Sequence, residues 1–251
     1  MPSTPRWNNR LQPQITQMST DLIGIVGGLG PRASAEFVRT IYEQWQPERE
    51  QETPRVVLYS DPTFPDRTEA VLKGREDELL DRLVNVLTQL HQLGASQFVI
   101  CCITIHNLLP RLPNDLRSRT ISLLDVIFDA VANSHKRHLL FCTTGARQLR
   151  LYEEHERWAD TAALFVMPDA LDQQEIHRLI YRIKQNQHVA KEHHLVESLL
   201  NKYGVTSFIA GCTEIHLLAS QFGPRCLDPL TEIARQLAHP EAFVAVGAST
   251  Q

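Results

Sequence analysis

One segment of this sequence occurs twice, 110 positions apart, and the duplication constrains the fold more than any other feature. The first copy is Gly94-Ala-Ser-Gln-Phe-Val-Ile-Cys-Cys-Ile-Thr-Ile-His106, and the second is Gly204-Val-Thr-Ser-Phe-Ile-Ala-Gly-Cys-Thr-Glu-Ile-His216. In each copy a glycine ends a helix, an apolar strand follows, and a cysteine stands at the carboxyl end of that strand. A glycine before an apolar strand is common by chance, but the matching cysteine and Ile-His pair favour a true repeat. The pattern predicts two similar lobes that each present one thiol.

The rest of the chain alternates short apolar runs with amphipathic stretches. Apolar runs predict strands at 22–28, 55–60, 97–103, 138–145, 161–168 and 207–213. Helical spacing predicts a helix that opens at Pro31 and helices within 76–93, 122–133, 147–159, 172–203 and 229–238. Strands separated by helices predict parallel sheets that are covered on both faces, so the expected fold class is α/β.

The repeat also predicts how the chain is organised. We expect two pseudo-symmetric lobes, each a mainly parallel sheet flanked by helices, with the active site in the cleft between them. Residues 21–121 and 226–251 are expected to form the first lobe, which carries Cys102, and residues 122–225 the second, which carries Cys212. Residues 1–20 are polar and interrupted by prolines, and we expect them to form a mobile tail.

The composition excludes several classes of protein. Lys and Arg number 25 against 29 Asp and Glu, so nothing favours a nucleic-acid partner, which calls for a basic surface. No apolar run reaches the roughly 20 residues that span a bilayer. The five cysteines are an odd number without disulfide or zinc spacing, which predicts reduced thiols in the cytoplasm and no metal site.

Two thiols that face each other across a cleft suit one chemical task. A thiol is a usable acid or base near neutral pH after modest tuning, so one thiolate can remove a proton from a carbon while the opposite thiol delivers one. This inverts a stereocentre. Cys101 alternates with Cys102 along its strand and should point the other way, and we expect Cys101, Cys142 and Cys226 to be structural.

Several stretches between residue 22 and about residue 230 resemble the aspartate/glutamate racemase family, specifically its aspartate racemase branch. The order and spacing of these stretches carry the resemblance more than any one of them does. They are the glycine loop Ile-Gly-Ile-Val-Gly-Gly-Leu-Gly-Pro at 23–31, Pro-Asp-Arg-Thr at 65–68, the Cys102 segment, Thr-Thr-Gly at 143–145, Ile-Tyr-Arg-Ile-Lys at 180–184 and Gly-Cys-Thr-Glu at 211–214.

The resemblance implies racemisation of an acidic amino acid, aspartate before glutamate, without pyridoxal phosphate, another cofactor or a metal, by a protein that we expect to be a homodimer. It implies that Cys102 and Cys212 are the two acid/base thiols and that Glu214 orients or assists Cys212. Arg67 and Lys184 would bind the side-chain carboxylate. The remaining substrate-binding residues would be Gly28, in the glycine loop, and the α-carboxylate ligands Thr104, Thr144 and Thr213.

One departure from the family pattern affects the expected specificity. The first family motif commonly reads Pro-Cys-Asn-Thr, whereas this chain has Cys-Cys-Ile-Thr at 101–104. Ile103 replaces an amide that helps to bind the substrate. The alternatives are therefore another reaction on the same scaffold, such as maleate isomerisation, hydantoin racemisation or decarboxylation, and a ligand-binding relative without turnover.

Other features leave two interpretations open. The glycines at 27–30 lack the full dinucleotide-binding spacing, and a carboxylate-binding turn is the better interpretation. Arg67 and Lys184 are either ligands or ordinary solvated charges. His106 and His216 either hydrogen-bond the thiols or stabilise the structure.

Overall fold

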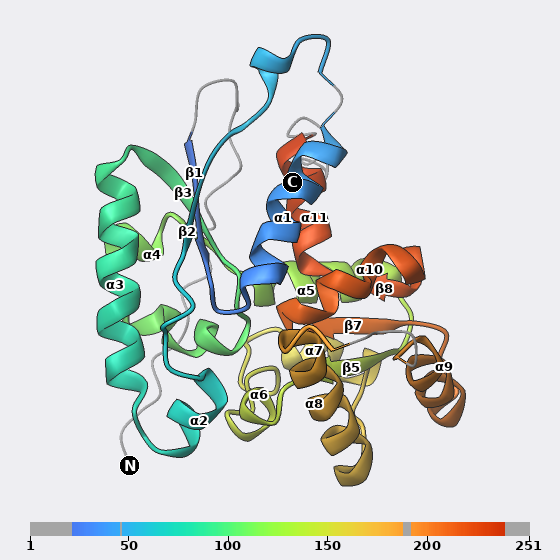
Figure 1. Ribbon diagram of the computed structural model, residues 1–251. Helices are drawn as coiled ribbons and strands as arrows, with labels where there is room; N and C mark the ends of the chain where they lie inside the picture. The colour runs from blue at the N-terminus through green and yellow to red at the C-terminus, as the bar shows by residue number, and fades with distance from the viewer. Residues whose placement is uncertain (1–21, 46, 188–191, 239–251) are drawn as a thin grey trace.

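The computed structural model describes residues 22–45, 47–187 and 192–238, and the tail predicted for residues 1–20 lies outside them. The described chain forms two four-stranded parallel sheets, one in each lobe (Figure 1). The strand order of the first sheet is β2 (Arg55–Ser60), β1 (Leu22–Gly27), β3 (Ala95–Ile100) and β4 (Thr120–Ile121). The order of the second is β6 (Phe165–Val166), β5 (His138–Cys142), β7 (Phe208–Gly211) and β8 (Cys226–Leu227). This confirms the predicted two-lobed α/β fold.

Helices connect the strands, as parallel pairing requires. In the first half of the chain these are α1 (Pro31–Gln44), α2 (Arg67–Leu72), α3 (Glu76–Gln92), α4 (Asn114–Arg117) and α5 (Leu123–Ser134). In the second half they are α6 (Thr144–Gln148), α7 (Trp158–Thr161), α8 (Ala170–Lys184), α9 (Glu192–Tyr203), α10 (His216–Phe222) and α11 (Pro229–Ala238). No helix among the described residues is long and apolar enough to cross a membrane.

Three apolar clusters fill the molecule. One lies outside the first sheet under α3, and one lies outside the second sheet under α8 and α9. The central cluster joins side chains of β1, β3, β5 and β7 with those of α1, α5 and α11, which lie between the two sheets in Figure 1. The two lobes therefore share one core, which fixes the strand ends of one lobe relative to those of the other.

The helix predicted over 147–159 is wrong. Helix α6 ends at Gln148, Arg150 has a left-handed φ of 49°, and α7 begins only at Trp158. Tyr152 is fully buried in the central cluster, and its hydroxyl donates a hydrogen bond to the Gly211 carbonyl at 3.0 Å. Burying this ring between the lobes requires a turn where the amphipathic pattern alone favours a helix, so tertiary packing overrides the local preference.

The two copies of the repeat adopt the same local structure. Strands β3 and β7 both hold the third place in their sheets. Gly94 and Gly204, with φ of 93° and 61°, follow α3 and α9 in the left-handed conformation that favours glycine. The sequence-based division placed 226–251 in the first lobe, yet β8 pairs with β7 and so belongs to the second sheet. Residues 239–251 lie outside the described range.

Candidate active site

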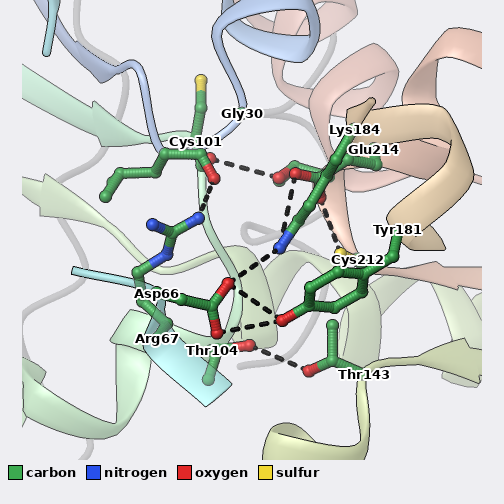
Figure 2. Close-up of polar contacts among 12 residues, drawn as sticks. Gly30, Asp66, Arg67, Cys101, Thr104, Thr143, Tyr181, Lys184, Cys212 and Glu214 are labelled. Carbon is green, nitrogen blue, oxygen red and sulfur yellow. Dashed lines mark hydrogen bonds and ion pairs between the residues drawn. The ribbon is translucent and has the colours of Figure 1, made fainter. Parts of the chain in front are cut away.

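The two repeated cysteines stand at adjoining strand ends. Cys102 lies two residues after β3, and Cys212 directly follows β7. Cys101 packs in the central cluster while Cys102 packs in the outer cluster of the first lobe, so their side chains point to opposite sides as expected. The Thr213 hydroxyl donates a hydrogen bond to the Cys101 carbonyl at 3.1 Å (Figure 2). The loops that carry the two thiols are therefore in direct contact across the lobes.

The Arg67 guanidinium is held in place by backbone carbonyls. Asp66 caps α2 by accepting a hydrogen bond from the Glu69 N–H at 3.0 Å, which makes Arg67 the first residue of that helix. The Nη1 atom of Arg67 donates to the Pro65 carbonyl at 3.0 Å, and Nη2 donates to the Leu29 carbonyl. The buried Nε has no hydrogen-bond partner among the described residues. The guanidinium also contacts the Cys102 side chain.

Negative neighbours keep the Arg67 side chain charged. Burial alone would lower its pKa, but the Cys102 thiol and the carboxylates of Asp66 and Glu214 raise the pKa above the usual value. The Arg67 guanidinium is thus coupled electrostatically both to Cys102 in its own lobe and to Glu214 in the other lobe. This residue is not the solvated loop arginine of the alternative interpretation.

Lys184 reaches the same place from the second lobe. It is the last residue of α8, and its Nζ lies 3.7 Å from Oδ2 of Asp66 and 4.0 Å from Oε1 of Glu214 (Figure 2). The ammonium also lies over the Tyr181 ring, 4.4 Å from its centroid. Burial would lower the pKa of Lys184, but Glu214 and Cys212 raise the pKa above its usual value. Lys184 is therefore a partly buried cation within the site.

A cavity of about 260 Å³ lies between the lobes at these two cations. Its lining combines the glycine loop with charged residues of both lobes, namely Gly28, Leu29, Gly30, Pro31, Pro62, Phe64, Asp66, Arg67 and Lys184. Gly28 has a φ of 81°, and a Cβ on it would lie 2.3 Å from the backbone of Asp61, so only glycine fits there. The glycine loop thus forms one wall of a cavity that holds two cations.

Cys212 is a thiol in this structure. Its Sγ donates a hydrogen bond to Oε2 of Glu214 at 2.8 Å. Burial and the Glu214 carboxylate raise the pKa of Cys212 well above its usual value. Nearby Lys184 acts in the opposite direction and lowers this pKa. Glu214 therefore contacts Cys212 as the sequence predicts.

The threonines predicted to bind the α-carboxylate are only partly brought together. The hydroxyls of Thr104 and Thr143 lie 3.2 Å apart across the lobes, whereas the Thr213 hydroxyl bonds to a backbone carbonyl. The Thr144 N–H donates to Nδ1 of His177 at 3.2 Å. Thr143, the cap of α6, is therefore the second-lobe threonine whose hydroxyl lies beside that of Thr104.

Two residues of the site were missed from the sequence. The Tyr181 hydroxyl bonds to both carboxylate oxygens of Asp66, at 2.9 Å each, and so connects α8 to the start of α2 (Figure 2). A signal for Tyr181 was present, because His177, Tyr181 and Lys184 follow one another at helical spacing on one face of α8. Asp66 could have been recognised as a helix cap before Arg67.

The repeated histidines do not contact the thiols. His106 is 3% exposed and bonds through Nδ1 to the Cys102 carbonyl at 2.9 Å, while its Nε2 accepts the Leu123 N–H at 3.1 Å. His216 pairs through Nδ1 with Asp228 at 2.6 Å and through Nε2 with Thr40 at 3.1 Å. Both rings are fully used in holding the loops in place, so the structural interpretation holds.

Ile103 lies away from the site. Its side chain is 1% exposed and packs in the central cluster beside Cys101. The amide that the family pattern has at this position therefore has no polar counterpart here. In the described part of the chain, no group of three or more His, Cys, Asp or Glu side chains is placed to hold a metal ion.

Comparisons with known proteins extend over most of the chain. A family model described as Asp/Glu/Hydantoin racemase matches residues 26–237. The structure is similar to that of an aspartate racemase from Picrophilus torridus, with a TM-score of 0.74 and 24% identity over 87% of this chain and 94% of that one. A glutamate racemase from Campylobacter jejuni gives a TM-score of 0.54 at 14% identity, with 91% and 86% of the two chains covered. An allantoin racemase from Klebsiella pneumoniae gives 0.51 at 12% identity, with 92% and 91% covered.

Proposed function

Because this chain belongs to the Asp/Glu/hydantoin racemase family, we propose that it interconverts the L and D forms of an acidic amino acid, aspartate before glutamate, without a cofactor. The observation that carries the proposal is the contact between the two cysteine loops, the 3.1 Å hydrogen bond from Thr213 to the Cys101 carbonyl. This contact holds the loop that carries Cys212 against the loop that carries Cys102. It supports the proposal that a substrate carbon bound at this interface has one thiol on each face.

The proposed reaction transfers two protons. A thiolate removes the proton from Cα on one face, the electron pair is delocalised into the α-carboxylate, and the opposite thiol delivers its proton to the other face of Cα. The product is the opposite enantiomer, with the protonation states of the two thiols exchanged. No electron acceptor or co-reactant is required. The reverse reaction uses the same groups in the opposite order.

The resting protonation state of Cys212 favours one assignment of the first step. Cys212 carries its proton, since burial and Glu214 raise the pKa of its thiol. We therefore assign Cys212 as the acid of the first step, which leaves Cys102 as the base. Once Cys212 has lost its proton, Lys184 is the cation that stabilises its thiolate.

The α-carboxylate must be stabilised as the α-proton leaves. The Thr104 and Thr143 hydroxyls hydrogen-bond each other at 3.2 Å at the interface of the lobes, which leaves one of the two O–H groups free to donate to a ligand. Donors that are fixed in a buried site stabilise developing negative charge more than water does, because they need no reorganisation. We propose that this pair, with backbone N–H groups of the loops, replaces the electron sink that a cofactor supplies in other racemases.

The cavity supports an acidic side chain. Arg67 and Lys184, one from each lobe, line the same 260 Å³ space. Two cations suit a second carboxylate better than the neutral ring of a hydantoin. We therefore propose that the substrate is a dicarboxylic amino acid whose distal carboxylate lies between these two side chains.

A chiral assay in heavy water tests the proposal. The purified protein is incubated with each enantiomer of the acidic and neutral amino acids, and with maleate and a hydantoin. We expect racemisation of aspartate with deuterium incorporated at Cα, and no change after dialysis against a chelator. Isomerisation of maleate or racemisation of the hydantoin would instead favour those reactions, and amino-acid binding without turnover would favour a non-catalytic relative.

A further inference from the structure

The two oxygens of the Glu214 carboxylate are used unequally. Oε2 accepts the Cys212 S–H at 2.8 Å, whereas Oε1 accepts no hydrogen bond from any described residue (Figure 2). The side chain is only 3% exposed. The Nζ of Lys184 lies 4.0 Å from Oε1, which is an electrostatic contact but too long for a hydrogen bond. One oxygen of a buried carboxylate is thus left without a donor.

Such an atom calls for an explanation. A buried polar atom without a partner costs about 1–3 kcal/mol, and more when it is charged, so nearly all such atoms in folded proteins are satisfied. Within the same site, Nε of Arg67 is a buried donor without an acceptor among the described residues. In this site, Oε1 of Glu214 therefore lacks a donor and Nε of Arg67 lacks an acceptor. A ligand with an N–H donor and an anionic acceptor can supply both missing partners.

The unpaired oxygen lies beside the cavity. A Cβ built on Gly30 would lie 2.4 Å from Oε1, so this atom rests against the bare backbone of the glycine loop. Gly30 and Lys184 both line the cavity. Because residue 30 has no side chain, the Glu214 carboxylate can lie against the backbone of the glycine loop. Its Oε1 atom is then within reach of a ligand bound between this loop and Lys184.

We propose that Oε1 of Glu214 binds the α-ammonium group of the substrate while Oε2 holds the Cys212 thiol. The inference rests on the proposed racemase function and adds a determinant of specificity to it. The ammonium nitrogen is bonded to Cα, so binding it to one oxygen while the other oxygen holds Sγ brings Cα and Cys212 together. An ammonium donates a charge-assisted hydrogen bond, whereas the hydroxyl of a hydroxy acid donates only a neutral one. Glu214 thereby selects amino acids over hydroxy acids.

Calorimetric titration of matched ligands tests this role. The two pairs are aspartate with malate and alanine with lactate, each as both enantiomers. Racemisation itself contributes no heat, because enantiomers have equal enthalpy. In the native protein we expect the amino acid of each pair to bind at least about tenfold tighter than the hydroxy acid, since a charge-assisted hydrogen bond is roughly twice as strong as a neutral one. In Glu214→Gln we expect the ratio to fall to within about twofold.

Two further variants separate recognition from folding. Glu192→Gln is the matched control, because Glu192 is another buried glutamate whose oxygens accept no hydrogen bond from a described residue and which lies at the start of α9. It should keep the native ratio. In Gly30→Ala the new Cβ displaces Oε1. This variant should lose the preference for amino acids even if Glu214→Gln fails to fold.

The outcomes are distinct. An equal loss of affinity for both members of a pair in Glu214→Gln would mean that Glu214 only positions Cys212 or Lys184, and an unchanged ratio would exclude any contact with the ammonium. Either result overturns the inference while leaving racemisation intact. A preference for amino acids that depends on Glu214, in a protein without turnover, would overturn the proposed function instead. If the native protein binds no amino acid, both the role of Glu214 and the proposed racemase function are wrong.

Discussion

The loop after β3 and the loop after β7 share a backbone but differ in charge. Both follow the third strand of a sheet, and both place a histidine four residues after the cysteine. Cys102 interacts with the Arg67 guanidinium, whereas Cys212 donates a hydrogen bond to the Glu214 carboxylate. His106 is held between two backbone groups, but His216 is paired with Asp228.

This difference shows that the two copies of the repeat have kept their backbone conformation but not the charges around their cysteines. The repeat preserves the backbone that places each thiol after the third strand of its sheet, where the two loops are in contact. The charges around the thiols have diverged, so that one neighbour is a cation and the other an anion. In the proposed reaction one thiol acts as the acid while the other acts as the base, and the Glu214 carboxylate favours the protonated form of Cys212.

The largest expected effect comes from removing either thiol. Cys102→Ala and Cys212→Ala should each lower the rate of racemisation by about 10³-fold or more, because each removes one of the two proton-transfer groups. The remaining thiol still faces one side of Cα. Each variant should therefore exchange the α-hydrogen of only one enantiomer with heavy water, and the two variants should act on opposite enantiomers. Chiral chromatography and proton NMR measure both quantities.

Cys101→Ala is the matched control, because Cys101 adjoins Cys102 but packs in the central core. It should retain native activity. Native turnover in either Cys102→Ala or Cys212→Ala, or exchange of the same enantiomer by both variants, would show that the two loops do not each supply a thiol to opposite faces of Cα.

The repeated histidines should give opposite dependences of stability on pH. Burial lowers the pKa of His106 from 6.5 to about 4, so its neutral form stabilises the fold above pH 6.5, and this contribution is lost as pH falls through about 4. The loss amounts to about 3 kcal/mol at about 1.4 kcal/mol for each pKa unit. For His216 burial acts to lower the pKa, but Asp228 raises it above 6.5. Its contribution is present below pH 6.5 and is lost as pH rises through the raised pKa.

Denaturant unfolding between pH 4 and pH 9 checks this contrast. His106→Gln should flatten the acid side of the stability curve, and His216→Gln should flatten the alkaline side. If both variants flatten the same side, then the two loops have not diverged in charge as the structure indicates.

The fold was largely predictable because its determinants are local. Apolar runs with glycine caps gave the main strands, and helical spacing gave α3, α5, α8, α9 and α11. The helix expected over 147–159 failed, since the burial of Tyr152 between the lobes is a tertiary effect. The two-residue strands β4 and β8 carry too little pattern to be recognised in a sequence.

The sequence indicated which residues to consider for the candidate site, but not which of these residues contact each other. The repeat located both cysteines, and the resemblance located Arg67 and Lys184. No pattern in the sequence indicates that Asp66 lies beside Lys184, because 118 residues separate them and only the docking of α8 on α2 brings them together. The same holds for Thr104 and Thr143, which come from different lobes.

The two cations should contribute to one carboxylate subsite although they come from different lobes. Arg67→Gln and Lys184→Gln should each raise KM for aspartate by about tenfold to a hundredfold, because each removes a charged partner of the distal carboxylate. KM for alanine should change far less. Arg182→Gln is the control, because Arg182 lies on the same helix as Lys184 but faces Glu192, at 3.8 Å. Equal changes in KM for aspartate and alanine would remove the proposed subsite.

The smallest expected effect tests the contact that joins the lobes beside that subsite. Tyr181→Phe keeps the ring under the Lys184 ammonium but removes both 2.9 Å hydrogen bonds to Asp66. The free energy of unfolding should fall by about 1 kcal/mol, the usual net value of a hydrogen bond. KM for aspartate should rise by about threefold to tenfold while kcat stays within about twofold, because Tyr181 positions a binding group and not a thiol. A fall in kcat with unchanged KM would instead mean that the contact between Tyr181 and Asp66 sets the distance between the two thiols. The remaining contacts between the lobes would then not be sufficient to hold the thiols at the separation that the reaction needs.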